Sequence, residues 1–319
     1  SDEEIANSLK NFPENLLTFR RRRFSFTGKA QHRFKITIKD KKKFFTKTSS
    51  SYPEEASLLE MIAFVIDREL KINRVPYSEQ KKIDLIKLIE KHDTKTGSED
   101  GDTNQGEYKP LSYLDQDTYL SLVQFWVNDL EKCINHKVIR ELIREKSRGG
   151  GTSIELLQNM AYLLHLYKLG ELQISNNLQK GFTDMVVLDL IIGNRDRRIA
   201  QNCFFINNTE EVVLIDHDHM VFYKEEPGKH FPYNAEGKNK QHSITYKYFC
   251  PKEERVIKML NNYKNGEEFA HIIKNKLINK FNNNKHFNNI NIEKTIAARF
   301  NYLRNHINTC DQSQKNRLY

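Results

Sequence analysis

The chain has 319 residues and a formal net charge of +9 at pH 7, and 29% of its residues are charged. A chain of this length can bury a sizeable core, either as one unit with two lobes or as two domains. No apolar run approaches the roughly 18 residues that a membrane-spanning helix needs, and no signal peptide is visible, so we expect an intracellular, cytoplasmic protein without a transmembrane segment. The basic balance predicts an anionic partner, such as a nucleotide, a phosphoinositide, an acidic protein or nucleic acid.

The four cysteines are widely spaced along the chain, at Cys133, Cys203, Cys250 and Cys310, and no Cys-x-x-Cys pair occurs. This spacing argues against a zinc site and against a disulfide framework. Cys203 lies in a short apolar segment, where we expect it to pack as a small hydrophobic residue. The cysteine pattern therefore favours a reducing compartment.

Two amphipathic strands are predicted near the N-terminus, because apolar residues alternate at Phe24 and Phe26 and again from Phe34 to Ile38. The turn between them contains Gly28 and is a candidate loop to cover a nucleotide. Arg20, Arg21, Arg22 and Arg23 precede it, with phenylalanines on both sides. We interpret this basic cluster as a candidate site for an inositol phosphate or an anionic lipid, and we do not expect nucleic acid there.

A third strand, residues 43–48, ends near Lys47, and a helix is predicted to begin near Pro53. The apolar positions of that helix follow the helical period from Leu58 to Leu70. Glu60 lies within it, and Glu55 is the second choice for the same role. A lysine at a strand end and a glutamate in the next helix form the ion pair that positions ATP phosphates in kinases.

The middle of the chain reads as helices joined by polar connections. Apolar spacing favours helices within residues 78–92 and 111–146. Between them, residues 92–110 are rich in Asp, Thr, Gly and Ser, so we expect a mobile loop. A run of three glycines at 149–151 marks a linker before a strongly apolar helix at 154–169.

Residues 183–222 contain the side chains that carry chemistry. An apolar run stops at Gly193, and a polar loop with Asp196 follows. Asn202 introduces a short strand, and a turn leads to a second strand that ends just before Asp216. The hairpin therefore brings the loop and Asp216 together. Phosphoryl transfer needs a carboxylate beside the incoming hydroxyl, which Asp196 would supply, and oxygen ligands for Mg²⁺ or Mn²⁺, which Asn202 and Asp216 would supply.

The chain resembles the atypical kinases of the Golgi casein kinase and Four-jointed type in these segments. Asp-Leu-Ile-Ile-Gly-Asn-Arg-Asp-Arg at 189–197 resembles their catalytic segment, and Leu-Ile-Asp-His at 214–217 resembles their metal-binding strand end. The helix from Glu60 through Ala-Phe-x-x-Asp-Arg to the Arg-Val-Pro exit at 74–76 is similar to their ion-pair helix. Phosphoinositide kinases and HipA-like kinases share weaker versions. The resemblance implies that Asp196 is catalytic, that Asp216 binds metal and that Glu60 is the ion-pair partner.

The chain departs from the kinase pattern at two places. Most kinases place a metal-binding Asn five residues after the catalytic Asp, where this chain has Gln201, with Asn202 one residue later. Asn202 directly precedes the apolar strand, so we favour Asn202 and keep Gln201 as the alternative. His217 and Asp218 stand where a glycine usually follows the metal-binding Asp. Asp218 is then either an extra ligand or a solvent-facing residue.

We therefore expect an α+β, bilobal protein kinase-like fold. Residues 1–108 would form a small antiparallel β lobe with one helix. Residues 109–319 would form a mainly α-helical C-lobe, with a catalytic loop at 193–202 and a metal-binding strand end at 212–218. The expected cofactors are ATP and Mg²⁺ or Mn²⁺.

The expected activity is that of an ATP-dependent phosphotransferase, with protein Ser/Thr as the first choice of acceptor and a phosphoinositide as the alternative. Adenylyl transfer by the same fold stays open. A non-catalytic kinase-like module that binds a polyanion is the second hypothesis. By analogy alone, an intracellular basic member of such a family also resembles a bacterial effector kinase.

Overall fold

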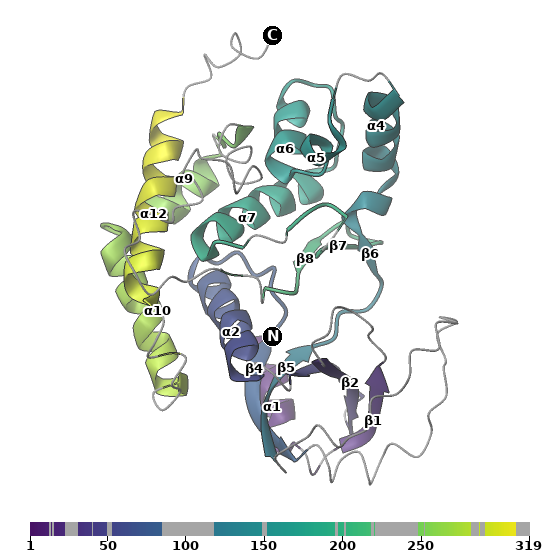
Figure 1. Ribbon diagram of the computed structural model, residues 1–319, viewed down its shortest axis with the longest axis vertical. Helices are drawn as coiled ribbons and strands as arrows, with labels where there is room; N and C mark the ends of the chain where they lie inside the picture. Colours follow the sequence, from purple (N-terminus) through teal and green to yellow (C-terminus); the bar gives the residue numbers. More distant parts are fainter. Residues whose placement is uncertain are drawn as a thin grey trace. The chain divides into compact units, whose positions relative to one another are not determined.

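The computed structural model of the chain is shown in Figure 1. It describes residues 1–12, 14, 16–22, 31–39, 41–49, 53–84, 118–148, 152–194, 197–200, 202–217, 220, 248–251, 253–281, 287 and 291–310. The chain divides into two compact units. Unit 1 comprises Ser1–Met61 and Pro76–Val127, and unit 2 comprises Ile62–Val75 and Asn128–Tyr319.

Unit 1 is built on a five-stranded sheet with the strand order β1-β2-β3-β5-β4, in which every neighbouring pair is antiparallel. The strands are β1 (Leu16–Arg22), β2 (Gln31–Ile38), β3 (Lys43–Ser49), β4 (Ser78–Asp84) and β5 (Thr118–Phe125). The short helix α1 (Asp2–Leu9) adds Leu9 to a core that also contains Ile36, Phe44 and Val123. On β2 the core residues Ile36 and Ile38 alternate with less buried positions, as expected for a sheet with one face on a core, whereas β5 is buried at every position from Ser121 to Gln124.

Helix α2 (Pro53–Glu69) runs from unit 1 into unit 2, and every residue from Leu58 to Asp67 is buried. The Asp67 carboxylate accepts hydrogen bonds from the backbone N–H groups of Arg74, at 2.9 Å, and Val75, at 3.2 Å, and forms an ion pair with Arg68. Burial raises the pKa of Asp67 to about 6, although Arg68 and the two N–H groups act in the opposite direction. Asp67 thereby fixes the turn that leaves the helix.

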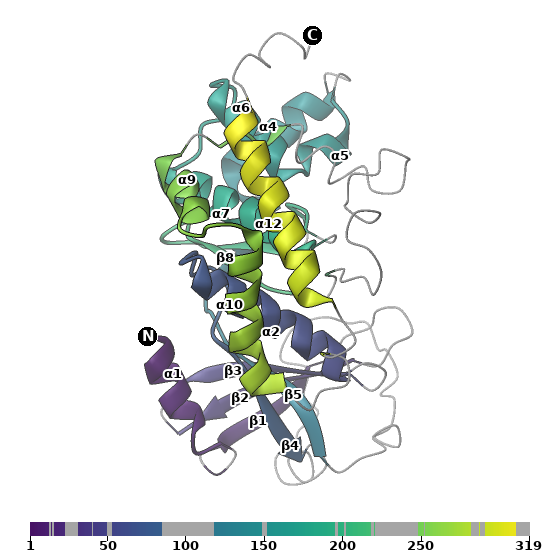
Figure 2. The same ribbon diagram turned by 90° about the vertical axis from the view of Figure 1, so that its left-hand side faces the viewer.

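Unit 2 is mainly helical and contains one small antiparallel sheet, in the order β6-β7-β8. Its long helix α7 (Asn176–Ile192) is buried from Gly181 onward, and α6, α12 and β8 pack against it. Helices α10 and α12 lie side by side (Figures 1 and 2). The other elements are β6 (Leu130–Lys132), η2 (Cys133–Asn135), α4 (Lys137–Arg148), α5 (Ile154–Leu157), α6 (Met160–Lys168), β7 (Cys203–Ile206), β8 (Val212–Leu214), α9 (Glu254–Asn261), α10 (Gly266–Phe281) and α12 (Ile292–Thr309).

The helices predicted within residues 78–92 and 111–146 are partly wrong. Ser78–Asp84 and Thr118–Phe125 are strands that pair with each other, and within the second segment the α-helix α4 begins only at Lys137. An apolar spacing of three residues, such as Leu120 to Val123, fits a helix, but it does not exclude a strand when the stretch is short. Residues 92–110 and the three glycines at 149–151 lie outside the described residues.

The prediction that the cysteines form no disulfide framework is wrong. The structure contains the disulfides Cys133–Cys203 and Cys250–Cys310, with Cα–Cα distances of 5.5 and 5.8 Å. The partners are 70 and 60 residues apart in sequence, so the fold brings them together and their spacing gives no signal. The cysteines therefore no longer support a reducing compartment, because structural disulfides persist in oxidising ones. Within the described part of the chain, no helix has the length and apolar character to span a bilayer.

Candidate functional site

Several predicted site residues fall outside the described part of the chain. These are Gly28, Arg23, Asp196, Gln201 and Asp218. The described candidates fall into two groups, which belong to different units: Lys47 and Glu60 in unit 1, and Asn202 and Asp216 in unit 2.

In unit 1, Lys47 lies on β3, in register with Leu122 of β5 on one side and Arg33 of β2 on the other. Arg33 is in turn opposite Arg22 of β1. The register therefore sets three basic positions in one row across three neighbouring strands, and it sets Arg20 opposite Lys35. This arrangement links part of the predicted basic cluster to the predicted ATP-binding lysine.

Glu60 lies on α2 and is completely buried. A carboxylate that is excluded from water requires a cation or hydrogen-bond donors close by, because an isolated buried charge is very costly. Burial of Glu60 is thus compatible with the predicted ion pair. Glu55, the second choice, lies in the first part of the same helix.

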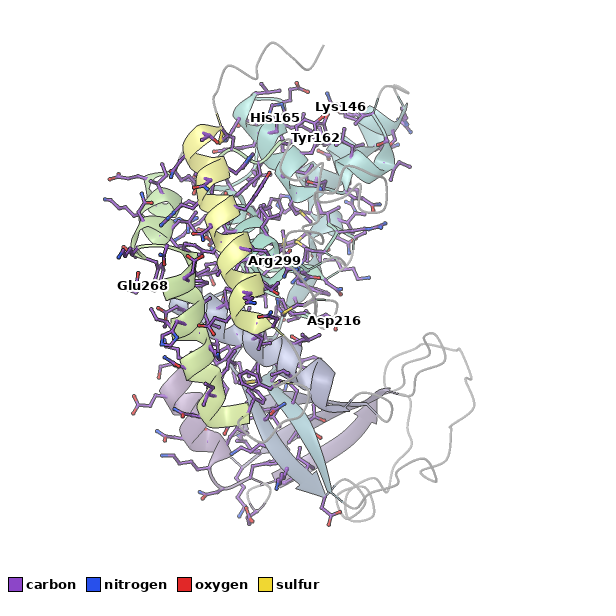
Figure 3. The ribbon with its side chains drawn as sticks, turned by 60° about the vertical axis from the view of Figure 1, so that its left-hand side comes forward. Lys146, Tyr162, His165, Asp216, Glu268 and Arg299 are labelled. Atoms are coloured by element: carbon purple, nitrogen blue, oxygen red, sulfur yellow. A yellow bond between two sulfur atoms is a disulfide. The ribbon has the colours of Figure 1, made fainter. Side chains whose placement is uncertain are left out.

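In unit 2, the segment that was predicted to be catalytic begins where α7 ends. Gly193 ends the helix in the left-handed conformation, with φ +68°, and the backbone N–H groups of Gly193 and Asn194 both donate to the carbonyl oxygen of Asp189. Arg299 of α12 donates to the Ile192 carbonyl oxygen at 2.9 Å and fills the space in front of Gly193. Figure 3 shows Arg299 and Asp216. The end of α7 is therefore fixed by buried polar contacts.

Arg197 connects this helix end to the hairpin that follows. Its buried guanidinium forms an ion pair with Asp189, with Nε 3.0 Å from Oδ2 and Nη2 3.3 Å from Oδ1. Its Nη1 donates to the carbonyl oxygen of Ile215 at 2.7 Å and to that of Asn202. One side chain thus contacts the helix end, the backbone of Asn202 and the residue before Asp216.

The hairpin of β7 and β8 places Asn202 and Asp216 at the same end. Cys203 is in register with Leu214, so Asn202 and Asp216 both stand just outside the paired strands. Both have left-handed backbones, with φ +58° and +65°, a conformation that Asn and Asp adopt more readily than other side chains. The loop before Asn202 is held at Ile199, whose N–H donates to the Gln158 carbonyl oxygen and whose carbonyl oxygen accepts from Ile134.

The donor chemistry of Asn202 and Asp216 fits Mg²⁺ or Mn²⁺. An amide and a carboxylate offer hard oxygen ligands, which these ions prefer. Among the described residues, no group of three or more His, Cys, Asp and Glu side chains is placed to hold a metal ion. Two protein oxygens suit an ion whose remaining ligands are water and the phosphates of a nucleotide.

A second charged cluster lies along α7. Asp184 is buried and pairs with Arg74, at 3.2 Å, and with Arg255. Burial raises the pKa of Asp184, against the opposing effect of the two guanidinium groups. Arg255 also contacts Glu253 at 3.2 Å. Arg74 opens the Arg-Val-Pro motif, so this contact gives that motif a packing role within unit 2.

Arg197, Asp189 and Asp184 have no role that was predicted from the sequence. Asp189 carries a signal, because an acid inside a buried apolar run requires a partner. The identity of that partner needs the fold. A cavity of about 200 Å³ between α6, α7, residues 248–251 and Glu253 contains none of the predicted site residues.

Comparison with known proteins shows similarity in structure but not in sequence. No protein-family model matches the chain, and neither does any curated protein sequence. A crystal structure of the Golgi casein kinase with Mn/ADP bound is similar, with a TM-score of 0.55 and 14% identity, over 99% of this chain and 78% of that one. A second structure of the Golgi casein kinase matches with the same TM-score and identity, over 99% of this chain and 77% of that one.

The structure of hydra Fam20 with sugar matches with a TM-score of 0.59 and 14% identity, over 99% of this chain and 92% of that one. The chain therefore has the atypical kinase-like fold of the Golgi casein kinase over nearly its whole length. This confirms the expected α+β kinase-like architecture, with an antiparallel sheet and a helix followed by a mainly helical part. At 14% identity the similarity concerns the fold alone.

Proposed function

We propose that the protein is an ATP-dependent phosphotransferase that works with Mg²⁺ or Mn²⁺. The observation that carries the proposal is the pair of oxygen-bearing side chains, Asn202 and Asp216, at one end of the β7–β8 hairpin. Arg197 binds the carbonyl oxygen of Asn202 and that of Ile215, the residue before Asp216. The proposal is further supported by the shared fold of a structure described as the Golgi casein kinase with Mn/ADP bound.

Each predicted residue has one role in this proposal. Lys47 binds the ATP phosphates, and Glu60 orients Lys47. Asp196 accepts or orients the proton of the acceptor hydroxyl, and Asn202 and Asp216 are the metal ligands. A bound metal ion would offset the negative charge of the phosphates. Gly28 belongs to the loop proposed to cover the nucleotide.

A protein Ser/Thr hydroxyl is our first choice of acceptor, and a phosphoinositide is the alternative. The net charge of +9 favours an acidic acceptor in either case. Arg22 and Arg33, which stand in one row with Lys47, support a second anion contact in unit 1, where an inositol phosphate or an anionic lipid would regulate the activity. The two disulfides favour an oxidising compartment as the place of action.

The proposal is tested by metal-dependent nucleotide binding, measured by calorimetry with ADP and Mn²⁺. We expect Asn202→Ala to weaken binding at least tenfold, or about 1.4 kcal/mol, because a metal ligand is lost. Gln201→Ala, the matched control at the neighbouring position, should bind within about twofold of the parent protein, or roughly 0.4 kcal/mol. The reverse result would assign the ligand to Gln201. Nucleotide binding that is absent, or that does not depend on metal, would contradict the proposal.

A further inference from the structure

We infer that Arg197 is a positioning residue that, together with Asp189, sets the geometry of the two metal ligands. The inference rests on the proposed function and deepens it, because it concerns how the same site is kept ready for a metal ion. Arg197 does not itself offer a metal ligand. It acts through the backbone of Asn202 and through the peptide group between Ile215 and Asp216.

Asp189 holds the guanidinium group of Arg197 at two points. Nε and Nη2 of Arg197 lie against the two carboxylate oxygens of Asp189, at 3.0 and 3.3 Å. A guanidinium is planar, so this two-point contact fixes the plane of the whole group and the direction of its third nitrogen. Asp189 therefore fixes the direction in which Nη1 of Arg197 points.

Nη1 of Arg197 has two hydrogen-bond acceptors, one just before β7 and one just after β8. Nη1 donates to the carbonyl oxygens of both Asn202 and Ile215, which lie just beyond the last pair of the β7–β8 ladder, Cys203 and Leu214. The two hydrogen bonds of this nitrogen therefore hold the two chain segments together just beyond the point where the β7–β8 pairing ends. The Ile215 carbonyl shares its peptide plane with the N–H of Asp216, so its direction restricts the Asp216 backbone.

The two restricted residues have a backbone conformation that is uncommon outside glycine. Asn202 and Asp216 have φ values of +58° and +65°. Left-handed backbones of this kind, outside glycine, persist only where the surrounding structure determines them. The two contacts of Nη1 are part of that surrounding structure. Loss of them should let either backbone relax and move its oxygen ligand away from the metal.

The positive charge of Arg197 also bears on metal binding. An unpaired guanidinium this close to a metal site would repel the cation, whereas Arg197 carries the carboxylate of Asp189 as its partner, and both are buried. Asp189→Asn should therefore weaken metal binding on this ground as well, because it leaves the guanidinium charge without its partner and no longer fixes the direction of Nη1. The loss expected for Arg197→Ala comes from the two missing hydrogen bonds of Nη1 and must exceed the gain from removing a positive charge.

Asp184 of α7 and Arg255 of α9 offer a control pair. Asp184 pairs with Arg255 and also with Arg74, and it is more deeply buried than Asp189. The described contacts of Arg255 go to Asp184 and Glu253, not to the hairpin. A general loss of stability in α7 should weaken Mn²⁺ binding in variants of both pairs. A positioning role should weaken Mn²⁺ binding only in variants of Arg197 and Asp189.

The experiment measures Mn²⁺ binding in the presence of ADP, from the paramagnetic resonance signal of free Mn²⁺. The variants are Arg197→Ala, Arg197→Lys, Asp189→Asn, Arg255→Ala and Asp184→Asn, each first checked for an intact fold by circular dichroism. We expect the Arg197 and Asp189 variants to bind Mn²⁺ about 10- to 100-fold more weakly. The Arg255 and Asp184 variants should remain within about twofold, or roughly 0.4 kcal/mol. Millimolar guanidinium should restore part of the affinity of Arg197→Ala and leave Arg255→Ala unchanged.

If Arg197→Ala does not fold, Arg197→Lys and Asp189→Asn decide the matter, because Arg197→Lys keeps the positive charge without the planar group and Asp189→Asn keeps the shape of the parent side chain. Normal affinity in the folded Arg197 and Asp189 variants overturns the inference, as does an equal loss in the control pair. The parent protein and Asp216→Ala separate this result from the proposed function. Mn²⁺ binding that depends on Asp216 but not on Arg197 refutes the positioning role alone. A parent protein that binds no Mn²⁺ with ADP refutes both.

Discussion

Two glycines that follow helices in unit 2 share a left-handed backbone but differ in their surroundings. Gly193, at the end of α7, has φ +68°, and Gly170, after α6, has φ +76°. A Cβ atom on residue 193 would lie 2.3 Å from Nη1 of Arg299. A Cβ atom on residue 170 would meet no atom within 4 Å. The two positions therefore separate the cost of the backbone from the cost of the contact.

We expect Gly170→Ala to lower the free energy of unfolding by about 1 kcal/mol, the cost of a left-handed alanine. Gly193→Ala should cost a further 1–3 kcal/mol or so, because Arg299 must move and its buried bond to the Ile192 carbonyl oxygen is lost. Chemical denaturation of the two variants measures the difference. Equal losses would mean that Arg299 does not hold the end of α7.

At the same scale, the sequence identifies the candidate metal ligands but not their support. Asn202 and Asp216 flank short apolar strands, which is a local pattern that can be recognised along the chain. Arg197 makes its contacts with residues 5, 8 and 18 positions away, and these depend on how the hairpin packs on α7. Sequence spacing alone gives no reason to choose it over Arg195 or Arg198.

Among the elements, α2 was predicted correctly and the strands β4 and β5 were not. Helix α2 is long, and its apolar positions repeat with the helical period even though it is buried on all sides near its middle. Strand β4 (Ser-Glu-Gln-Lys-Lys-Ile-Asp) is polar, and its only fully buried side chains are Ser78 and Ile83. It is a strand because its backbone pairs with β5, which is a tertiary contact.

The disulfides are the element-scale feature that the sequence concealed, and they permit a direct test. We expect peptide mapping of the unreduced protein to give the pairs Cys133–Cys203 and Cys250–Cys310. Replacement of Cys133 and Cys203 by serine should lower the free energy of unfolding by about 2–5 kcal/mol, because the bond closes a long loop. Free thiols in the unreduced, unfolded protein, or other pairings, would contradict the structure.

The fold of the whole molecule is shared with proteins whose sequences are very different from this one. The similarity to the Golgi casein kinase covers 99% of the chain at 14% identity, and no family model matches the sequence. Cores tolerate wide substitution if volume and pattern are kept, so a shared fold survives after most sequence similarity is lost. The segments that resemble these kinases, residues 60–76 and 183–222, contain polar residues at positions where packing alone would not require them. These segments were therefore sufficient to indicate the fold. The compartment could not be predicted from the cysteines, because their pairing depends on the fold.

The central claim is metal-dependent transfer of the terminal phosphate of ATP. The most direct test is incubation with ATP labelled separately at the γ- and α-phosphates, with Mn²⁺ or Mg²⁺, an acidic protein and mixed phosphoinositides. We predict that the γ-label reaches an acceptor, that it is lost in Asp216→Ala, and that the α-label stays on the nucleotide. Transfer of the α-label would replace phosphoryl transfer by adenylyl transfer. No transfer from either position, or γ-transfer that persists in Asp216→Ala, would contradict the account.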